Sequence, residues 1–414
     1  MTNAPHQERL FTALSISLGL LPAVLVSVKG AYGIVALLIL ALSIAAIVVL
    51  ARRGELDWSS TWRRAMPIWI PFCGFFLAFA ISVVVTGDSL RGLDYPNRWI
   101  ILLPIVFALV AARKKIDYRH FWTGIAVGSI ATGLLASYQI YVLQFGRAIG
   151  FMTQNPYGNL SVLLGLLCGV GALYQRSQTR SIVLALAGWG GIWASLLSVT
   201  RGGWPVVVPF VILLALHLRS LPRKAAIGLL AVHLVLVALA YPTAAYLVSN
   251  RIDMVAQDLS VENRQARSDT SVGARLAMWD ISFQIFREHP VVGIGPTRFQ
   301  AELHRKNTEQ YRSADIYTQN VAHQEFLDAM ARAGIIGGVA LAALFAYPLI
   351  AIYRQRKTRP AWRSLGGLGV LGFLGSFLLF GLANTTLTNH TSLLFFIIAM
   401  SVLWAEYLQE TDPG

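Results

Sequence analysis

A histidine and two arginines of this sequence stand where polar segments meet long apolar stretches. His323 precedes a helical pattern in which Leu327 and Met330, four and seven residues on, share its face. That face is apolar, so the imidazole is predicted to point into the protein; a purely structural histidine is the alternative. An imidazole has an unperturbed pKa of about 6.5 and suits a general base at neutral pH. Gln324, beside it, is a candidate for positioning a hydroxyl group.

Arg201 and Arg275 are the candidate anion-binding side chains. The planar guanidinium group is always charged and matches the geometry of a phosphate. Arg201 follows an apolar stretch and precedes Gly202 and Gly203, where the missing side chains let backbone amides approach an anion closely. The alternative for Arg201 is a snorkelling side chain at a helix end, with Trp204 as an interface anchor. For Arg275 the alternative is a charge on a helix surface.

Other polar residues are weaker candidates for substrate binding: Arg147, Asn155, Asn159, Arg267 and His390. The two asparagines belong to a polar loop that is predicted either to line a cavity or to cap a helix. The histidine lies in a polar run, residues 384–391, between two apolar stretches. The sequence contains no HExxH pattern, cysteine pair, P-loop or G-x-S-x-G pattern. We therefore expect no metal and no cofactor.

Apolar stretches dominate the chain, which is 56% hydrophobic and only 13% charged over 414 residues. About 20 apolar residues in a helix span the hydrocarbon core of a bilayer. The predicted fold is an all-α integral membrane protein with about 12 transmembrane helices and one long helical loop between spans 9 and 10. The spans are expected at about 10–28, 31–51, 67–86, 99–112, 122–144, 157–175, 181–199, 204–218, 225–248, 334–353, 365–383 and 391–408.

Basic residues predict the orientation of these spans, because short cytoplasmic loops collect Lys and Arg. One set of loops carries Arg52, Arg53, Arg63, Arg64, Arg113, Lys114, Lys115, Arg119, Arg176, Arg180, Arg219, Arg223, Lys224, Arg354, Arg356, Lys357, Arg359 and Arg363. The alternate short loops hold only Lys29, Arg91, Arg98, Arg147 and Arg201. Both termini are therefore predicted to be cytoplasmic. The net charge of +14 is explained by topology and by contact with anionic membrane lipids, so no nucleic-acid partner is expected.

The chain divides into residues 1–249 with spans 1–9, an outer loop at 250–333, and residues 334–414 with spans 10–12 and a cytoplasmic tail. The loop is predicted to hold an amphipathic helix whose packed stripe is Val272, Leu276, Trp279, Phe283 and Phe286. Glu288-His289-Pro290 should end it. A second helix is expected at 298–310 after an N-cap at Thr297, and a third from about Thr318 through His323.

Two patterns in this loop resemble a known family. His323-Gln324, nine further residues and then Gly334-x-x-Gly337 is similar to the pattern of the O-antigen ligases. The run Arg275-x-x-x-Trp279 followed by Pro290-x-x-Gly293-x-Gly295 resembles the large outer loop of O-antigen ligases and O-antigen polymerases. The number of spans and the place of the loop are similar as well. One position departs from the family: Pro205 stands four residues after Arg201, where a leucine is frequent.

The resemblance implies a bacterial inner-membrane enzyme whose site faces the periplasm. Its partners would be an undecaprenyl-pyrophosphate-linked glycan and a lipid A–core oligosaccharide, with the glycan transferred from the first to the second. His323 would then be the base, and Arg201 and Arg275 would stabilise the departing pyrophosphate. A single displacement would invert the anomeric carbon and would use neither metal nor cofactor.

Two other interpretations stay open. An O-antigen polymerase or a protein O-oligosaccharyltransferase would use the same donor with a different acceptor. A lipid or solute transporter is an alternative of another class. No carboxylate lies in the middle of a predicted span, and ion-coupled transporters usually keep ionisable groups there. This pattern disfavours a transporter driven by ions.

Overall fold

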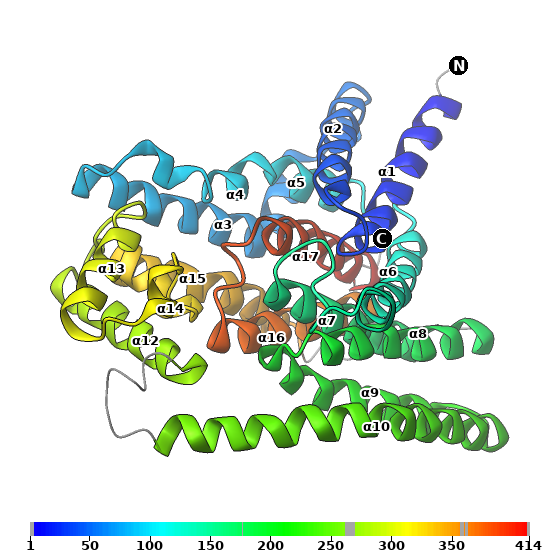
Figure 1. Cartoon of the computed structure of the whole chain (residues 1–414). Helices are drawn as coiled ribbons and strands as arrows, with labels where there is room; N and C mark the ends of the chain where they lie inside the picture. Colours follow the sequence, from blue (N-terminus) through cyan, green and yellow to red (C-terminus); the bar gives the residue numbers. More distant parts are fainter. Residues whose placement is uncertain (1–3, 176, 261–269, 357–359, 361–362, 412–414) are drawn as a thin grey trace.

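The computed structural model describes residues 4–175, 177–260, 270–356, 360 and 363–411, and within them the chain is helical, without a strand (Figure 1). The helices in chain order are α1 (Ala4–Val24), α2 (Ala31–Arg52), α3 (Trp58–Thr86), η1 (Leu90–Leu93), α4 (Asn97–Ile101), α5 (Leu103–Ala111), α6 (Arg119–Ser137), η2 (Tyr138–Val142), α7 (Gln154–Tyr174), α8 (Gln178–Leu197), η3 (Arg201–Val206), α9 (Val207–Ser220), α10 (Arg223–Ser260), α12 (Ser271–Glu288), α13 (Phe299–Gln310), α14 (Ala314–Tyr317), α15 (Glu325–Arg354), α16 (Leu365–Ala383) and α17 (His390–Thr411).

Ten helical segments within the described ranges are long and apolar enough to cross a membrane, which agrees with the predicted multi-pass class. The predicted span 99–112 is instead two short helices, α4 and α5, with a break at Leu102. Pro104 accounts for the break, because it has no N–H group to donate to the carbonyl of Ile100. The predicted total of about twelve spans therefore stays a prediction.

The core of the helix bundle is built around α7 and α17, whose side chains are almost all buried. Outward-facing positions of the peripheral helices are apolar too, as at Ile34 (73% exposed) and Leu239 (70% exposed). Apolar side chains on the outside as well as the inside are typical of helices that lie in lipid.

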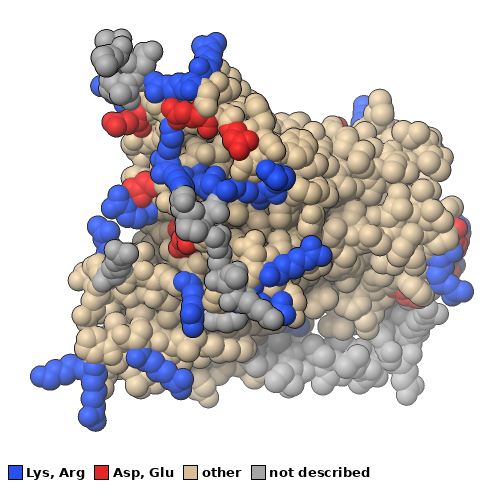
Figure 2. Space-filling model, turned by 180° about the vertical axis from the view of Figure 1, so that it is seen from behind, with Lys and Arg blue, Asp and Glu red and all other residues tan. Residues whose placement is uncertain are grey.

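Charge is distributed unevenly along the bundle. Lys and Arg side chains gather at the end away from α12, α13 and α14, as the view from behind shows (Figure 2). The α2–α3 and α5–α6 connections meet at this basic end, where Lys115 forms an ion pair with Glu55. The opposite end carries the helices that lie outside the predicted spans (Figure 1).

Two expectations for the start of the long loop need correction. Helix α10 continues to Ser260, twelve residues beyond the predicted end of span nine at 248. Helix α12 does end at Glu288 as predicted, but it buries a different face. The buried residues of α12 include Ala274, Ala277, Met278, Ile281, Ser282 and Ile285, while Leu276 and Phe283, which were predicted to pack inward, are 45% and 47% exposed. The helix packs against α13 and α15.

The later helices of the loop also differ in detail from the prediction. Helix α13 begins at Phe299, and Arg298 takes the N-cap position. Thr297 instead donates from its backbone N–H to Asp88 Oδ2 at 2.8 Å, which ties the loop to the end of α3. Residues 318–324 are not helical, so the predicted helix from Thr318 through His323 was wrong.

Helix α15 contains a break at Ala333 and Gly334, at the residue where span ten was predicted to start. Gly334 has φ +63° and ψ −161°, a backbone conformation that is essentially restricted to glycine. A Cβ there would lie 2.1 Å from the carbonyl oxygen of Val291. Three backbone hydrogen bonds join the turn at residues 290–295 to the break: Ile335 N to Pro290 O (2.8 Å), Ile294 N to Ala331 O (3.0 Å) and Gly295 N to Arg332 O (3.1 Å). The glycine-containing motifs of the sequence therefore form one rigid joint between the turn and α15.

Candidate functional site

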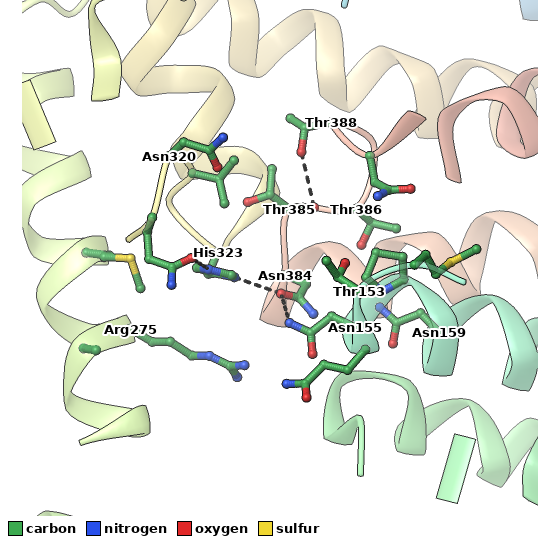
Figure 3. A pocket seen from close by; sticks show the side chains of 18 of the residues that line it. Thr153, Asn155, Asn159, Arg275, Asn320, His323, Asn384, Thr385, Thr386 and Thr388 are labelled. Atoms are coloured by element: carbon green, nitrogen blue, oxygen red, sulfur yellow. Dashed lines mark hydrogen bonds between the residues drawn. The ribbon is translucent and has the colours of Figure 1, made fainter. Parts of the chain in front are cut away.

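A polar cavity of about 840 Å³ lies where the extramembrane helices meet the helix bundle (Figure 3). Three segments far apart in the sequence line it. One is α12 with residues 315–323, the second is the start of α7, and the third is the connection 384–389 between α16 and α17. Among the predicted site residues, the lining contains His323, Arg275, Asn155 and Asn159.

His323 lies just before α15, with Gln324 as the N-cap of that helix. Its φ of +53° is a left-handed backbone conformation, so its side chain does not share the helical face of Leu327 as predicted. The indole N–H of Trp279 donates to the carbonyl oxygen of His323 at 3.4 Å. Trp279 and Arg275 are one helical turn apart on α12, so the Arg-x-x-x-Trp motif places both residues beside the histidine.

Both ring nitrogens of His323 are held by amide side chains. Nδ1 lies 3.0 Å from Asn384 Oδ1, and Nε2 lies 2.8 Å from Gln319 Oε1. Asn384 Oδ1 also accepts from Asn155 Nδ2 at 3.2 Å, which keeps its oxygen turned towards the ring. A neutral imidazole donates through one nitrogen and accepts through the other. A proton on Nδ1, donated to Asn384 Oδ1, leaves the lone pair of the neutral ring on Nε2, the nitrogen that the Gln319 side chain contacts.

The surroundings of His323 favour its neutral form. Burial lowers the pKa of His323 below its usual value, and the positive charge of Arg275 lowers it further. The hydrogen bond to Asn384 acts in the opposite direction and raises this pKa. An imidazole held neutral in a polar cavity is able to accept a proton from a hydroxyl group at neutral pH.

Arg275 reaches into the cavity from α12, on the side facing Asn155 (Figure 3). Within the described part of the chain, no carboxylate or hydrogen-bond acceptor engages its side chain. Burial lowers the pKa of its guanidinium, which nevertheless stays charged at neutral pH. A half-buried cation without an ion-pair partner, facing a cavity, is suited to bind an anion there.

The predicted polar loop 154–159 is the first part of α7, so the expected loop is a helix start. Pro156 is compatible with this position, because the first turn of a helix leaves backbone N–H groups without acceptors. Asn155 and Asn159, one turn apart, face the same side of α7. Asn159 is 1% exposed, and its Oδ1 has no hydrogen-bond partner in the described structure.

The remaining predicted site residues do not line the cavity. Arg201, Gly202 and Gly203 begin η3 behind its wall, where a Cβ on Gly203 would lie 3.0 Å from Asn159 Oδ1. Arg147 is exposed and donates to Gln154, and the side chain of Gln324 caps α15 by accepting from Leu327 N. His390 is the exposed first residue of α17. Arg267 lies outside the described residues.

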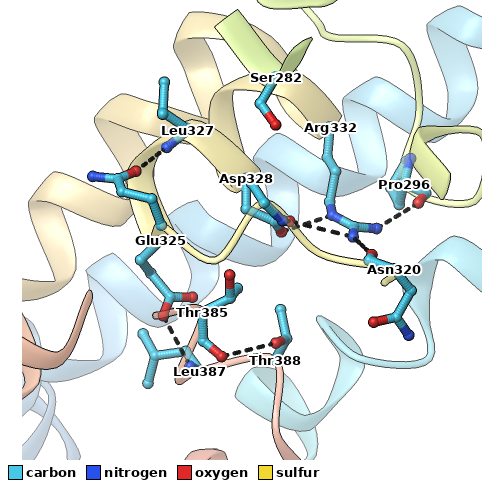
Figure 4. A network of polar contacts seen from close by, with 12 residues as sticks. Ser282, Pro296, Asn320, Glu325, Leu327, Asp328, Arg332, Thr385, Leu387 and Thr388 are labelled. Carbon is cyan, nitrogen blue, oxygen red and sulfur yellow. Dashed lines mark hydrogen bonds and ion pairs between the residues drawn. The ribbon is translucent and has the colours of Figure 1, made fainter. Parts of the chain in front are cut away.

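The sequence analysis missed Asn384 and Gln319, the two amides that hold the imidazole. The polar run 384–391 attracted attention only for His390, although a run of Asn and Thr between two spans is itself a signal for a polar surface. Its backbone is fixed by Glu325, whose carboxylate accepts from Thr386 N (2.5 Å) and Leu387 N (3.0 Å) (Figure 4). The connection that carries Asn384 is thereby fastened to the start of α15.

A second group of polar contacts shapes the segment before His323. Arg332 Nε donates to Asp328 Oδ2 at 2.7 Å, and its Nη1 donates to the carbonyl oxygen of Pro296 at 2.7 Å (Figure 4). Asp328 Oδ1 accepts from Ala322 N at 2.9 Å, next to the histidine. Two side chains of α15, Asp328 and Arg332, therefore hold the segment 320–324 that precedes this helix.

These observations define a class: a multi-pass membrane protein whose polar site lies at the end of its helix bundle, under a cap formed by α12, α13 and α14. The O-Antigen ligase family model matches residues 182–342, a stretch that contains Arg201, Arg275 and His323. This match supports membership of the O-antigen ligase/polymerase superfamily, a group whose activity is of the glycosyl-transfer type. The chain is also similar to a Haemophilus influenzae protein described as uncharacterized, with 23% identity over 297 residues, or 69% of this chain and 72% of that protein.

Proposed function

We propose that this protein is an O-antigen ligase, which transfers a glycan from undecaprenyl pyrophosphate to a hydroxyl group of a lipid A–core oligosaccharide. The observation that carries the proposal is the pairing of His323 and Arg275 in one cavity. A buried neutral imidazole and a guanidinium group without an ion-pair partner are the two groups that such a transfer needs.

In the proposed reaction, the acceptor hydroxyl oxygen attacks the anomeric carbon of the glycan while the bond from that carbon to the pyrophosphate oxygen breaks. His323 Nε2 takes the proton of the hydroxyl group, which in the proposed complex occupies the place that the Gln319 side chain has at this nitrogen. The pyrophosphate leaves with the bonding electron pair, and Arg275 stabilises its growing negative charge. Arg201, which stands behind the cavity wall in this structure, is proposed as a second cation for the same leaving group. A single displacement inverts the anomeric carbon.

The path of the lipid chain is also part of the proposal. An apolar groove of about 440 Å³ lies between α7, α9 and α16 and is lined by Leu166, Pro209 and Leu382, among others. Leu382 comes two residues before Asn384, which lines the polar cavity. A polyprenyl chain in this groove would bring its pyrophosphate to the cavity from the side, out of the membrane.

The uneven distribution of Lys and Arg supports an orientation of the helix bundle across the membrane. Lys and Arg gather at the end away from α12–α14, and short cytoplasmic loops collect these residues (Figure 2). We place the basic end and both termini in the cytoplasm of a bacterial cell. The cavity then faces the periplasm, across the inner membrane.

Transfer by the purified full-length protein in detergent tests the function. Wild-type protein should join a polyprenyl-pyrophosphate-linked glycan to lipid A–core, and His323→Ala should lower kcat about 10²- to 10⁴-fold, the usual contribution of a general base. His289→Ala replaces an exposed histidine beyond the end of α12 and should leave the rate unchanged. Wild-type activity in His323→Ala would refute the base assignment. Extension of the lipid-linked glycan without attachment to the core would indicate a polymerase.

A further inference from the structure

A groove between the first two turns of α6 and of α8 lies at the basic end of the helix bundle, far from the polar cavity. We propose that this groove binds one anionic phospholipid of the adjacent leaflet, with the lipid phosphate at Arg180 and one acyl chain over Ala126 and Val183. The inference goes beyond the proposed function and does not depend on it, because binding is measured without glycan transfer.

Helices α6 and α8 pack in parallel. Ser129 Oγ donates to the carbonyl oxygen of Ala187 at 2.7 Å, and Trp193 Nε1 donates to Ser137 Oγ at 3.0 Å. At Gly190 the two backbones nearly touch, since a Cβ there would lie 2.3 Å from the carbonyl oxygen of Ser129. The helices pack less closely nearer the basic end, where a groove of about 540 Å³ lies between them.

The mouth of the groove is polar and carries a net positive charge. Arg119, Arg180, His120 and Asp117 line it. Asp117 is occupied by Arg119, which donates to it from Nη2 at 2.7 Å and from Nε at 2.9 Å. Arg180 is exposed, and the described residues provide its guanidinium with no ion-pair partner. Arg180 is therefore available to a phosphate group, and the positive end of the α8 macrodipole adds to the attraction.

The rest of the groove is apolar. Trp122, Ala126 and Leu184 are its most buried lining residues, at 2%, 8% and 6% exposure, and Val183 beside them is 52% exposed. The indole N–H of Trp122 donates to Glu406 at 3.0 Å, so the ring offers only apolar surface to the groove. A free phosphate ion gains nothing from this part of the groove, whereas an acyl chain buries apolar area there.

The groove continues as an apolar stripe along α6. Thr123 lines the groove, and Val127, Ile130 and Leu134 follow it at helical spacing with 49%, 44% and 68% exposure. Helix α6 belongs to a segment that is long and apolar enough to cross a membrane. The stripe therefore lies in lipid, and it extends the path of an acyl chain that starts in the groove.

The charge at the mouth favours an anionic headgroup over a zwitterionic one. A zwitterionic headgroup brings its own cation, which Arg119 and Arg180 would repel. Figure 2 shows that Lys and Arg gather at this end of the bundle, where they attract anionic lipids to the surface. Basic pockets between transmembrane helices are known to bind anionic lipid headgroups.

Thermal-shift titrations of delipidated full-length protein in detergent test the inference. Phosphatidylglycerol should raise Tm with an apparent Kd about tenfold lower than that of phosphatidylcholine with the same acyl chains. Arg180→Gln should raise the Kd for phosphatidylglycerol about tenfold, the effect of losing a hydrogen bond to a charged group. Arg180→Lys keeps the charge and should stay within about threefold of wild type. Arg219→Gln, at an exposed arginine of α9 that does not line the groove, is the matched control.

Val183→Trp tests the place of the acyl chain, because the larger side chain fills the apolar part of the groove. It should weaken binding of phosphatidylglycerol and leave any binding of glycerol 1-phosphate unchanged. Equal Kd values for the two lipids in wild type would overturn the anionic preference. Equal Kd values for phosphatidylglycerol in Arg180→Gln and Arg219→Gln would overturn the site. Glycerol 1-phosphate that stabilises wild type as strongly as phosphatidylglycerol would indicate a site for a free phosphate and overturn the lipid.

Discussion

The hydrogen bond between Asn384 and His323 predicts that two substitutions of Asn384 shift the pKa of His323 in opposite directions. Asn384 Oδ1 lies 3.0 Å from Nδ1 of the imidazole, and this bond raises the pKa of His323 against the effect of burial. Asn384→Leu removes the bond and should lower that pKa further. Asn384→Asp places a carboxylate at the same nitrogen and should raise it, because the charged imidazolium gains a partner.

The size of each effect follows from the geometry. Loss of a buried hydrogen-bond partner costs about 1–3 kcal/mol, so Asn384→Leu should lower kcat about 5- to 150-fold at neutral pH. A carboxylate about 4 Å from the imidazolium charge contributes up to about 4 kcal/mol at an effective dielectric constant of about 20. Burial of the new carboxylate opposes this in part, and we expect the pKa of His323 to rise in Asn384→Asp.

Initial rates of glycan transfer between about pH 5 and 9 measure both effects. A base works only when deprotonated, so the acidic limb of the rate profile should move to higher pH in Asn384→Asp and to lower pH in Asn384→Leu. Gln310→Glu makes the same amide-to-carboxylate exchange at the exposed end of α13 and should leave the limb in place. If both Asn384 variants kept the wild-type limb and kcat, the imidazole would not be the titrating base.

Three further predictions concern the supports of the site. Gly334→Ala should lower the free energy of unfolding by more than about 2 kcal/mol, seen as a fall in Tm in detergent, since its Cβ would collide with Val291; an unchanged Tm would contradict the rigid joint. Arg332→Gln loses the ion pair to Asp328 and should cost about 2–3 kcal/mol, with activity falling in parallel with Tm. Trp279→Phe loses only a long hydrogen bond and should reduce kcat by less than about fivefold without a change in Tm.

Much of the architecture could be predicted because apolar length alone selects membrane helices. The break at Leu102 was missed because only the length of the apolar stretch was considered, although Pro104 within it removes a backbone hydrogen bond. The packed face of α12 was predicted wrongly because large side chains were assumed to be buried. Ala274 and Met278 are buried instead, and Phe283 is 47% exposed, because the packed face depends on the neighbouring helices α13 and α15, which the pattern of α12 alone does not show.

The site was predicted less completely than the helices. The types of residue and their spacing indicated His323 and Arg275, which the structure brings to one cavity. The left-handed backbone conformation of His323 could not be predicted from the sequence, because it depends on contacts with distant segments. Asn384 was missed for the same reason: it lies 61 positions from the histidine, and only the packing of α16 against α15 makes them neighbours.

The break at Gly334 also fixes the length of the helical segment that separates it from His323. Between the imidazole and this break lies a helical segment of eight residues, 325–332, about 12 Å long at 1.5 Å per residue. One inserted residue would turn the start of the helix by about 100° and raise it by about 1.5 Å, which would carry the histidine away from the two amides that hold it. The segment therefore acts as a spacer of fixed length, and Glu325, Asp328 and Arg332 within it also hold the neighbouring segments. A distant member of the superfamily should be recognisable by the interval from its histidine to its glycine even where the residues between them differ.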